Sequence, residues 1–185
     1  MIMSSIILQN VRLSYANIWK PKGIDGGEPR YSASLLMDKD VNAKDIAKLN
    51  KAIKECYDAA VPTIWGGKAP AASKFNSPLY DGDDEADDKG EAYVNTMFIN
   101  PKSKNQPGIV DKKVQPILDQ TEVYSGCYAN VSVSIYAYNH PQGGKGIAFG
   151  LNNIQKVKDG EPLGGVAPKA EDEFSAVDDS DDLLD

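Results

Sequence analysis

Apolar and polar side chains alternate along residues 126–139, and this pattern constrains the fold more than any other feature of the chain. A period of two is that of a β-strand, whose successive side chains point to opposite faces of a sheet. One face consists of cysteine, alanine, valine and isoleucine, and we assign it to the core. The other face carries Tyr128, Tyr136 and Tyr138 among asparagine and serine, so it presents flat rings to solvent or to a partner.

Similar alternation predicts further strands at residues 4–15, 31–37, 93–99 and 147–151, whereas the apolar residues of 42–60 recur at helical spacing. Asp40 or Asn42 supplies a cap for the first helical turn, and Pro62 ends the helix. Glycines and prolines predict a loop at residues 17–29, and Gly143-Gly144 predicts a hairpin turn. The fold class is therefore mainly β with one principal helix.

Small residues follow that hairpin on one strand face, at Gly146, Ala148 and Gly150. Two interpretations stay open. Small side chains allow a ligand or another backbone to approach closely, and they also permit a tight bend in a barrel.

The charge of the chain is unevenly distributed. Its formal net charge is -7, but residues 171–185 hold eight acids and no base, and residues 81–91 hold seven acids and one base. Without these two segments the remainder carries a net charge of +7. The acidic balance therefore belongs to appendages, and the folded body is basic.

Domain boundaries follow from the same composition. We predict one domain over residues 1–162, which contains a mobile, loop-like acidic insertion at 81–91. A calcium loop of the EF-hand type starting at Asp81 would need Gly and Glu where Ala86 and Ala92 stand, so that interpretation fails. Residues 163–185 are too poor in apolar surface to offset the entropy of ordering, which predicts a disordered acidic tail.

The cysteines and the apolar runs indicate where the protein resides. Cys56 and Cys127 are too few for a disulfide framework, which favours a reduced, intracellular setting. The first residues lack the basic and apolar regions of a signal peptide. No segment approaches the roughly 20 apolar residues that span a bilayer. We expect a cytoplasmic protein.

Catalytic signals are weak. The single histidine, His140, precedes Pro141 in a predicted turn, and no zinc spacing or phosphate-binding glycine motif occurs. The carboxylates concentrate in segments predicted to be mobile, whereas catalytic pairs need fixed geometry. We therefore expect no enzyme activity, no cofactor and no metal.

A basic β domain with interleaved tyrosines is typical of a groove for single-stranded nucleic acid, in which cations follow the phosphates and rings stack on bases. The alternative for each tyrosine is ordinary packing beneath a helix or loop. The candidate stacking residues are Tyr128, Tyr136, Tyr138, Trp19, Tyr15 and Tyr31, and the candidate phosphate contacts are Arg12, Lys20, Lys22, Arg30, Lys102, Lys104, Lys112 and Lys113. The tethered acidic tail would compete with DNA for these cations and dock on partner proteins.

Four segments carry a resemblance to a known family. The chain resembles the single-stranded DNA-binding proteins of tailed bacteriophages, formerly a domain of unknown function, which have an OB fold and an acidic C-terminal tail. The matching segments are Asn10-Val-Arg-Leu-Ser-Tyr, Tyr31-Ser-Ala-Ser-Leu-Leu, Val123-Tyr-Ser-Gly-Cys-Tyr-Ala-Asn-Val and Gly146-Ile-Ala-Phe-Gly-Leu-Asn-Asn-Ile-Gln. The resemblance implies a five-stranded Greek-key barrel with elaborated loops. It also implies binding of single strands without sequence specificity during phage replication or recombination, in the infected host cell.

Two features depart from the expected pattern. The OB helix commonly lies between the third and fourth strands, whereas the predicted helix follows the second. Either a bend within residues 4–15 divides that segment into two strands, or the barrel is elaborated. Bacterial single-strand binders usually end in Pro-Phe after their acids, whereas this tail ends Leu183-Leu184-Asp185. The resemblance therefore does not carry over docking to the host's tail-binding pockets.

Two other classes remain as alternatives. The tyrosine face could be a protein interface of a phage structural or interaction protein. The acidic segment around Asp81, Asp83 and Asp84 could instead serve a metal-dependent nuclease.

Overall fold

A computed structural model describes residues 5–23, 26–164 and 170–178. The strands are β1 (Ser5–Lys22), β2 (Arg30–Asp38), β3 (Tyr80–Asp81), β4 (Thr96–Ile99), β5 (Lys102–Ser103), β6 (Gly108–Val110), β7 (Tyr128–His140) and β8 (Gly144–Lys158). The α-helices are α1 (Ala43–Ala60), α2 (Ala86–Lys89) and α3 (Ala170–Glu173), and the 3₁₀ turns are η1 (Gly82–Asp84), η2 (Glu91–Tyr93) and η3 (Gln120–Glu122). The expected mainly β fold with one principal helix is confirmed.

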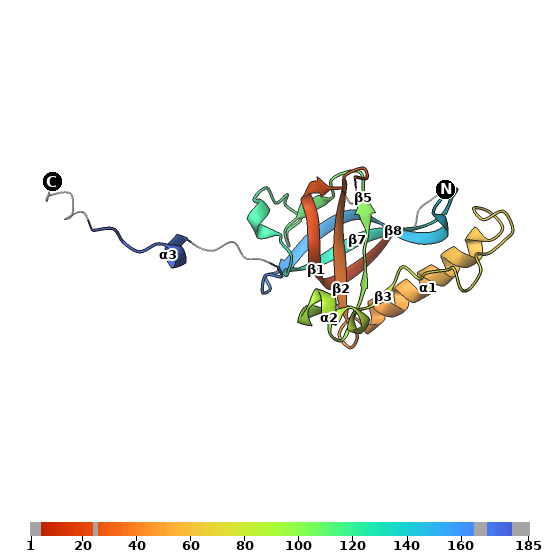
Figure 1. Ribbon diagram of the computed structural model, residues 1–185, viewed down its shortest axis with the longest axis horizontal. Helices are drawn as coiled ribbons and strands as arrows, with labels where there is room; N and C mark the ends of the chain where they lie inside the picture. Colours follow the sequence, from red (N-terminus) through yellow and green to blue (C-terminus); the bar gives the residue numbers. More distant parts are fainter. Residues whose placement is uncertain (1–4, 24–25, 165–169, 179–185) are drawn as a thin grey trace.

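The sheet closes on itself because β1 has two partners. Its first half pairs with β7 and its second half pairs with β2, both antiparallel. The remaining links run from β7 to β8, from β8 to β5 in parallel, and from β5 to β2. The result is a ring in the order β1-β7-β8-β5-β2, as in an OB-type barrel (Figure 1). β4 pairs with the part of β2 next to that paired with β5, and β3 extends the sheet beyond β4.

β1 bends both in the part that pairs with β7 and in the part that pairs with β2. Asn10 and Tyr15 have positive φ angles of 51° and 46°, and the register shifts at both places. The Asn10 backbone N–H donates to Asn130 Oδ1 at 2.9 Å, which holds the first bend against β7. β1 continues to Lys22, so the loop expected at residues 17–29 is shorter than predicted, because Asn17 and Lys22 still pair with β2.

The helix lies where the sequence places it, after the second strand. β4 and β5 pair in succession with β2, so they form consecutive parts of one ring strand. α1 is therefore inserted between the second and third strands of the barrel, and the elaborated-barrel interpretation describes this chain. Leu49 and Ile53 of α1 are buried in the main core with the apolar residues of β1 and β7. Asn42 does not cap the helix with its side chain, since its Oδ1 accepts from Asp38 N and its Nδ2 donates to Gln9 O.

Residues 81–91 adopt η1 and α2, with β3 beginning just before them, and not the loop expected there. Lys39 Nζ lies 2.9 Å from Asp81 Oδ1 and 2.7 Å from Asp83 Oδ2. Asp81 also caps η1 by accepting from Asp83 N. The acidic residues therefore acquire regular structure because a lysine from the β2–α1 turn neutralises two of them.

The predicted tail, residues 163–185, lies largely outside the described residues, which include only 163–164 and 170–178 of it. Its first residue is bound to the barrel, where Leu163 N donates to Ser125 O at 2.9 Å. Within the described residues, no helix is both long and apolar enough to cross a membrane.

Candidate nucleic-acid interface

A groove of about 1020 Å³ crosses the barrel between the β1–β2 side and the β7–β8 hairpin. It collects side chains that are far apart in the sequence. Six of the predicted contact residues line it, namely Tyr15, Lys22, Arg30, Lys102, Tyr136 and Tyr138. Serines and asparagines fill much of the space between them, including Ser32 and Ser34 of β2 and Asn17 of β1.

Tyr138 is the most open ring of β7, with 39% of its surface exposed. Its partner across the hairpin is Gly146. A Cβ at Gly146 would collide with Tyr138 Oη and Cζ and would lie 2.9 Å from Cε1, so the ring lies flat over the glycine. The small residue therefore makes room for a tyrosine of the same hairpin.

The part of the hairpin beyond the ring, residues 135–149, is here called the β7–β8 arm. The segment after α1 braces it. Trp65 is 2% exposed, and its Nε1 donates to Tyr138 O at 3.0 Å. Lys145 Nζ donates to Lys68 O at 2.6 Å and to Trp65 O at 3.2 Å. Tyr57 packs edge-on against Trp65 at 5.0 Å. The segment after α1 therefore fixes the position of Tyr138 on the arm.

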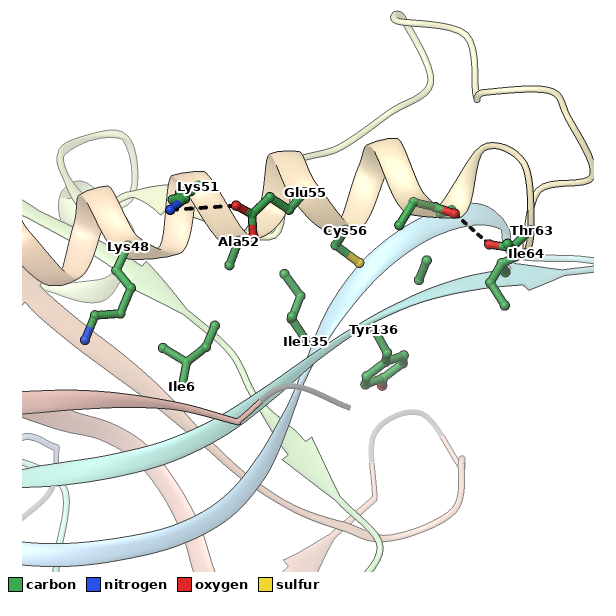
Figure 2. A pocket seen from close by; sticks show the side chains of 13 residues that line it. Ile6, Lys48, Lys51, Ala52, Glu55, Cys56, Thr63, Ile64, Ile135 and Tyr136 are labelled. Atoms are coloured by element: carbon green, nitrogen blue, oxygen red, sulfur yellow. Dashed lines mark hydrogen bonds and ion pairs between the residues drawn. The ribbon is translucent and has the colours of Figure 1, made fainter. Parts of the chain in front are cut away.

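A second cavity, of about 490 Å³, lies between α1 and the start of the arm (Figure 2). Its walls are mostly apolar, with Cys56 from the helix and Ile135 from β7. Tyr136 lines this cavity and the groove alike. Burial raises the pKa of the Cys56 thiol, so this cysteine is held in its neutral form.

Tyr15 is exposed to 56% because the bend in β1 turns it into the groove. Beside it lie Tyr80 and Lys89, which our sequence analysis missed. Lys89 Nζ lies 5.9 Å from the centre of the Tyr15 ring. The sequence offers one signal for these two residues. Lys89 is the single base of the acidic segment, and Tyr80 lies immediately before that segment.

Besides Lys89, three cations line the groove. Lys22 and Arg30 are cross-strand partners at the end of β1 and the start of β2, and Lys102 lies on β5. Arg30 has only a loose contact with Glu28, at 3.9 Å, and both side chains are largely exposed. An exposed ion pair of this kind contributes little, so Arg30 remains available for an anion.

His140 holds the hairpin turn, since its Nδ1 accepts from Gln142 N and Gly143 N.

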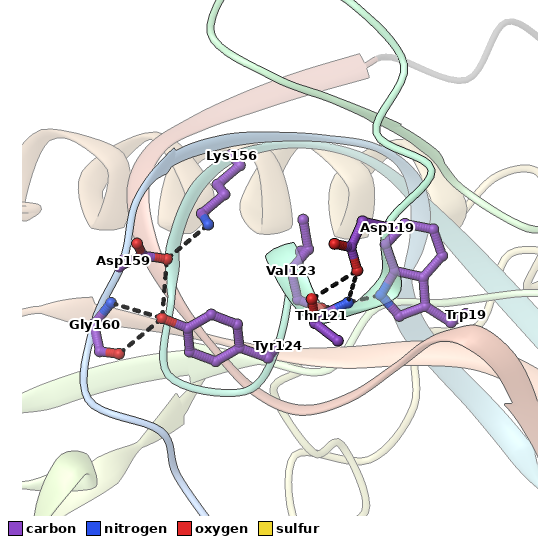
Figure 3. Close-up of polar contacts among 8 residues, drawn as sticks. All are labelled: Trp19, Asp119, Thr121, Val123, Tyr124, Lys156, Asp159 and Gly160. Carbon is purple, nitrogen blue, oxygen red and sulfur yellow. Dashed lines mark hydrogen bonds and ion pairs between the residues drawn. The ribbon is translucent and has the colours of Figure 1, made fainter.

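The other predicted aromatic residues lie outside the groove. Trp19 is half-buried and its Nε1 donates to Val123 O at 3.0 Å (Figure 3). Tyr128 sits at the far end of β7, where Arg12 and Lys158 lie 5.6 Å and 4.7 Å from its ring centre. Tyr31 is half-buried on β2 and does not line the groove.

The cations outside the groove have other surroundings. Arg12 Nε donates to Gly126 O at 3.1 Å and Nη2 to Glu161 O at 2.8 Å, so it ties the end of the barrel to the C-terminal segment. Lys104 lies 3.8 Å from Glu28. The remaining candidates are exposed on β1 or in the loop after β6; they are Lys20, Lys112 and Lys113.

A polar cluster closes the end of the barrel at which Arg12 contacts the C-terminal segment (Figure 3). Tyr124 Oη donates to Asp159 Oδ1 and to Gly160 O, both at 3.0 Å, and Lys156 Nζ lies 2.6 Å from Asp159 Oδ1. Lys156 lowers the pKa of Asp159, first through its hydrogen bond. A Cβ at Gly126 would collide with Glu161 O, so only glycine permits this close packing. The cluster fixes the point from which the tail leaves the barrel.

Two carboxylates of the acidic segment, those of Asp81 and Asp83, are bound by other groups. Lys39 lowers the pKa values of Asp81 and Asp83, in each case first by hydrogen bonding to the carboxylate. Asp83 Oδ1 also accepts from Asn95 N at 2.8 Å. Across the part of the chain that the structure describes, no three histidine, cysteine or acidic side chains gather as metal ligands. These contacts give the segment a structural role and lend no support to the nuclease alternative.

A closed OB-like ring with a groove lined by tyrosines, lysines and arginine is the architecture of the OB-type proteins that bind single-stranded nucleic acid. The comparisons with known proteins agree. The chain belongs to the family described as Enterobacter phage Enc34, ssDNA-binding protein, which matches residues 4–184. The expected membership is thereby confirmed.

Relatives are similar along nearly the whole chain. Putative protein p50 of Acyrthosiphon pisum secondary endosymbiont phage 1 is 30% identical over 190 residues, which cover 97% of this chain and 98% of that protein. The single-stranded DNA-binding protein from bacteriophage Enc34, solved in complex with ssDNA, is 28% identical with a TM-score of 0.74, over 86% of this chain and 89% of the other. Gp2.5, a single-stranded DNA-binding protein encoded by bacteriophage T7, has a TM-score of 0.61 at 17% identity, over 96% and 97% of the two chains, and shows similarity of fold alone.

Proposed function

We propose that this chain binds single-stranded DNA in the groove, without sequence preference, during phage DNA replication and recombination in the infected host cell. The role is one of binding and not of catalysis. The observation that carries the proposal is the convergence of Tyr15, Tyr136 and Tyr138 with Lys22 and Arg30 in one groove. Membership of the Enc34 family and the solved complex of the Enc34 protein with ssDNA support it.

The chemistry of the groove accounts for binding without sequence preference. A tyrosine ring stacks on any base because every base has a π-face, and each stacked base contributes about 1–3 kcal/mol. Lysine and arginine contact phosphates, which are the same at every nucleotide. The rings and cations thus supply affinity without reading base edges.

A titration of labelled oligothymidylate, followed by fluorescence anisotropy at several salt concentrations, tests the proposal. For a short oligothymidylate that contacts only Lys22, Arg30 and Lys102, the logarithm of the binding constant should fall with the logarithm of salt with a slope of about −2, at about −0.7 per phosphate contact. Lys113→Gln, outside the groove, is the matched control and should leave the slope unchanged. Absence of binding at low salt would refute the proposal and favour a protein interface.

The acidic tail, residues 163–185, adds a regulatory part to the proposal. Its eight acids resemble a chain of phosphates and compete weakly with DNA for the groove. The 21 residues after Gly164 reach at most roughly 70 Å, which exceeds the dimensions of the barrel. The tail also recruits replication or recombination proteins.

Deletion of residues 171–185 is therefore expected to tighten DNA binding, most at low salt, because an intramolecular competitor is removed. The same anisotropy titration measures this. A charge-neutral variant of equal length, with the tail acids replaced by their amides, separates charge from length. Unchanged or weaker binding by both variants would argue against competition by the tail.

A further inference from the structure

We infer that residues 80–89 add a separate nucleotide subsite to one end of the groove, with the base stacked on Tyr80 and its phosphate on Lys89. This inference rests on the proposed function, because it names a further part of the same DNA path. Both side chains line the groove, yet both come from residues 80–89 beside β4 and not from the five strands of the ring.

Tyr80 is a supported stacking surface. Its ring is stacked on Phe98, with 5.3 Å between ring centres and 25° between planes. Phe98 is buried and is held in turn by Tyr93, which packs edge-on at 5.2 Å. Tyr80 itself is 42% exposed. One face of the ring is therefore fixed by the core while the side chain remains open to the groove, so a base stacks there at little cost in side-chain entropy.

Lys89 is a cation placed over aromatic rings. Its Nζ lies 5.1 Å from the centre of Phe98, 5.8 Å from Tyr93 and 5.9 Å from Tyr15. Among the described residues, no carboxylate lies within ion-pair distance of Lys89. The rings hold the ammonium group in place without neutralising it, so it retains its charge for a phosphate.

The subsite is formed before DNA arrives. Lys39 anchors the segment through Asp81 and Asp83, as described above. Gly82 is buried, and a Cβ there would collide with Thr96 Oγ1 and Tyr93 O, so the segment packs closely on β4. Because Tyr80 and Tyr138 lie on separate elements of the groove, a strand must be long enough to reach both.

A length series of oligothymidylates tests the inference, from about 4 to about 16 nucleotides, the range of OB-fold site sizes. We expect Tyr80→Ala to bind the longest oligonucleotides about 5- to 150-fold more weakly than wild type, which corresponds to one stacked base. The shortest oligonucleotides should bind both proteins equally. Tyr80→Phe keeps the ring and should behave as wild type at every length.

Lys89→Met provides an independent measurement, because it keeps an apolar chain over the rings and removes the charge. For long oligonucleotides it should reduce the salt slope by about 0.7. Thermal unfolding of each variant verifies that the fold is retained. Equal affinities of wild type and Tyr80→Ala at all lengths, or an equal loss at all lengths, would overturn the added subsite. If wild type itself fails to bind, the proposed function fails instead.

Discussion

Gly146→Ala should weaken DNA binding although residue 146 contributes no side chain to it. A Cβ at this position would meet the Tyr138 ring, with Cε1 at 2.9 Å and Cζ and Oη closer still. The backbone cannot yield easily, because Gly146 pairs with Tyr138 in the regular ladder of β7 and β8. The ring must therefore swing away from β8 and leave the position in which we propose that it stacks on a base.

The effects of Gly146→Ala on DNA binding and on stability can be estimated separately. Loss of one stacked base costs about 1–3 kcal/mol of binding free energy, or about 5- to 150-fold in the dissociation constant. Gly146 does not have a positive φ angle, so alanine fits its backbone, and the smaller entropy of the unfolded chain stabilises by about 0.4–1 kcal/mol. That gain offsets part of the lost ring contact. The loss of binding free energy should thus be much larger than the loss of unfolding free energy.

A double-mutant cycle with Tyr138→Ala gives the decisive measurement. Anisotropy titrations of wild type, both single variants and the double variant are run at one salt concentration, with urea unfolding of each. If Gly146→Ala acts through the ring, it should have no further effect in the Tyr138→Ala background. An equal loss in both backgrounds would refute that mechanism. Unchanged affinity of Tyr138→Ala would remove this tyrosine from the interface.

Two further predictions concern the elements that position the groove. Trp65→Phe removes the hydrogen bond to the β7–β8 arm, so it should lower the free energy of unfolding by about 1–3 kcal/mol in urea titrations and also weaken DNA binding. Trp19→Phe removes a similar bond outside the groove and should leave the affinity unchanged. The folded pKa values of Asp81 and Asp83 lie below their ordinary value of 3.8, so their contribution to stability is present above that pH and is lost as pH falls through the folded values. Lys39→Met should reduce this acid sensitivity between about pH 5 and pH 2 in urea titrations, and an unchanged pH profile would contradict it.

Much of the fold follows from local patterns. The strands around residues 31–37 and 126–139 and the helix at 42–60 lie where the spacing of apolar residues predicts them. The errors are equally local in origin. The glycines and prolines predict a loop from residue 17, yet β1 extends to Lys22 because it still pairs with β2 there. The acids of 81–91 suggested a loop, yet the charge of Lys39, distant in sequence, allows them to fold.

In the candidate site, too, local patterns predict some features, and contacts between distant segments decide the others. Tyr128 and Tyr138 share one face of one strand, which the alternation indicates correctly, but ten residues of strand separate them by roughly 33 Å. Of these two tyrosines, Tyr138 lines the groove and Tyr128 does not. Tyr80 and Lys89 have no sequence pattern that joins them to it. Periodicity records which face of an element is buried, because that depends on neighbours along the chain. Which exposed residues meet depends on the bends and the closure of the ring, and these are decided by contacts between distant segments.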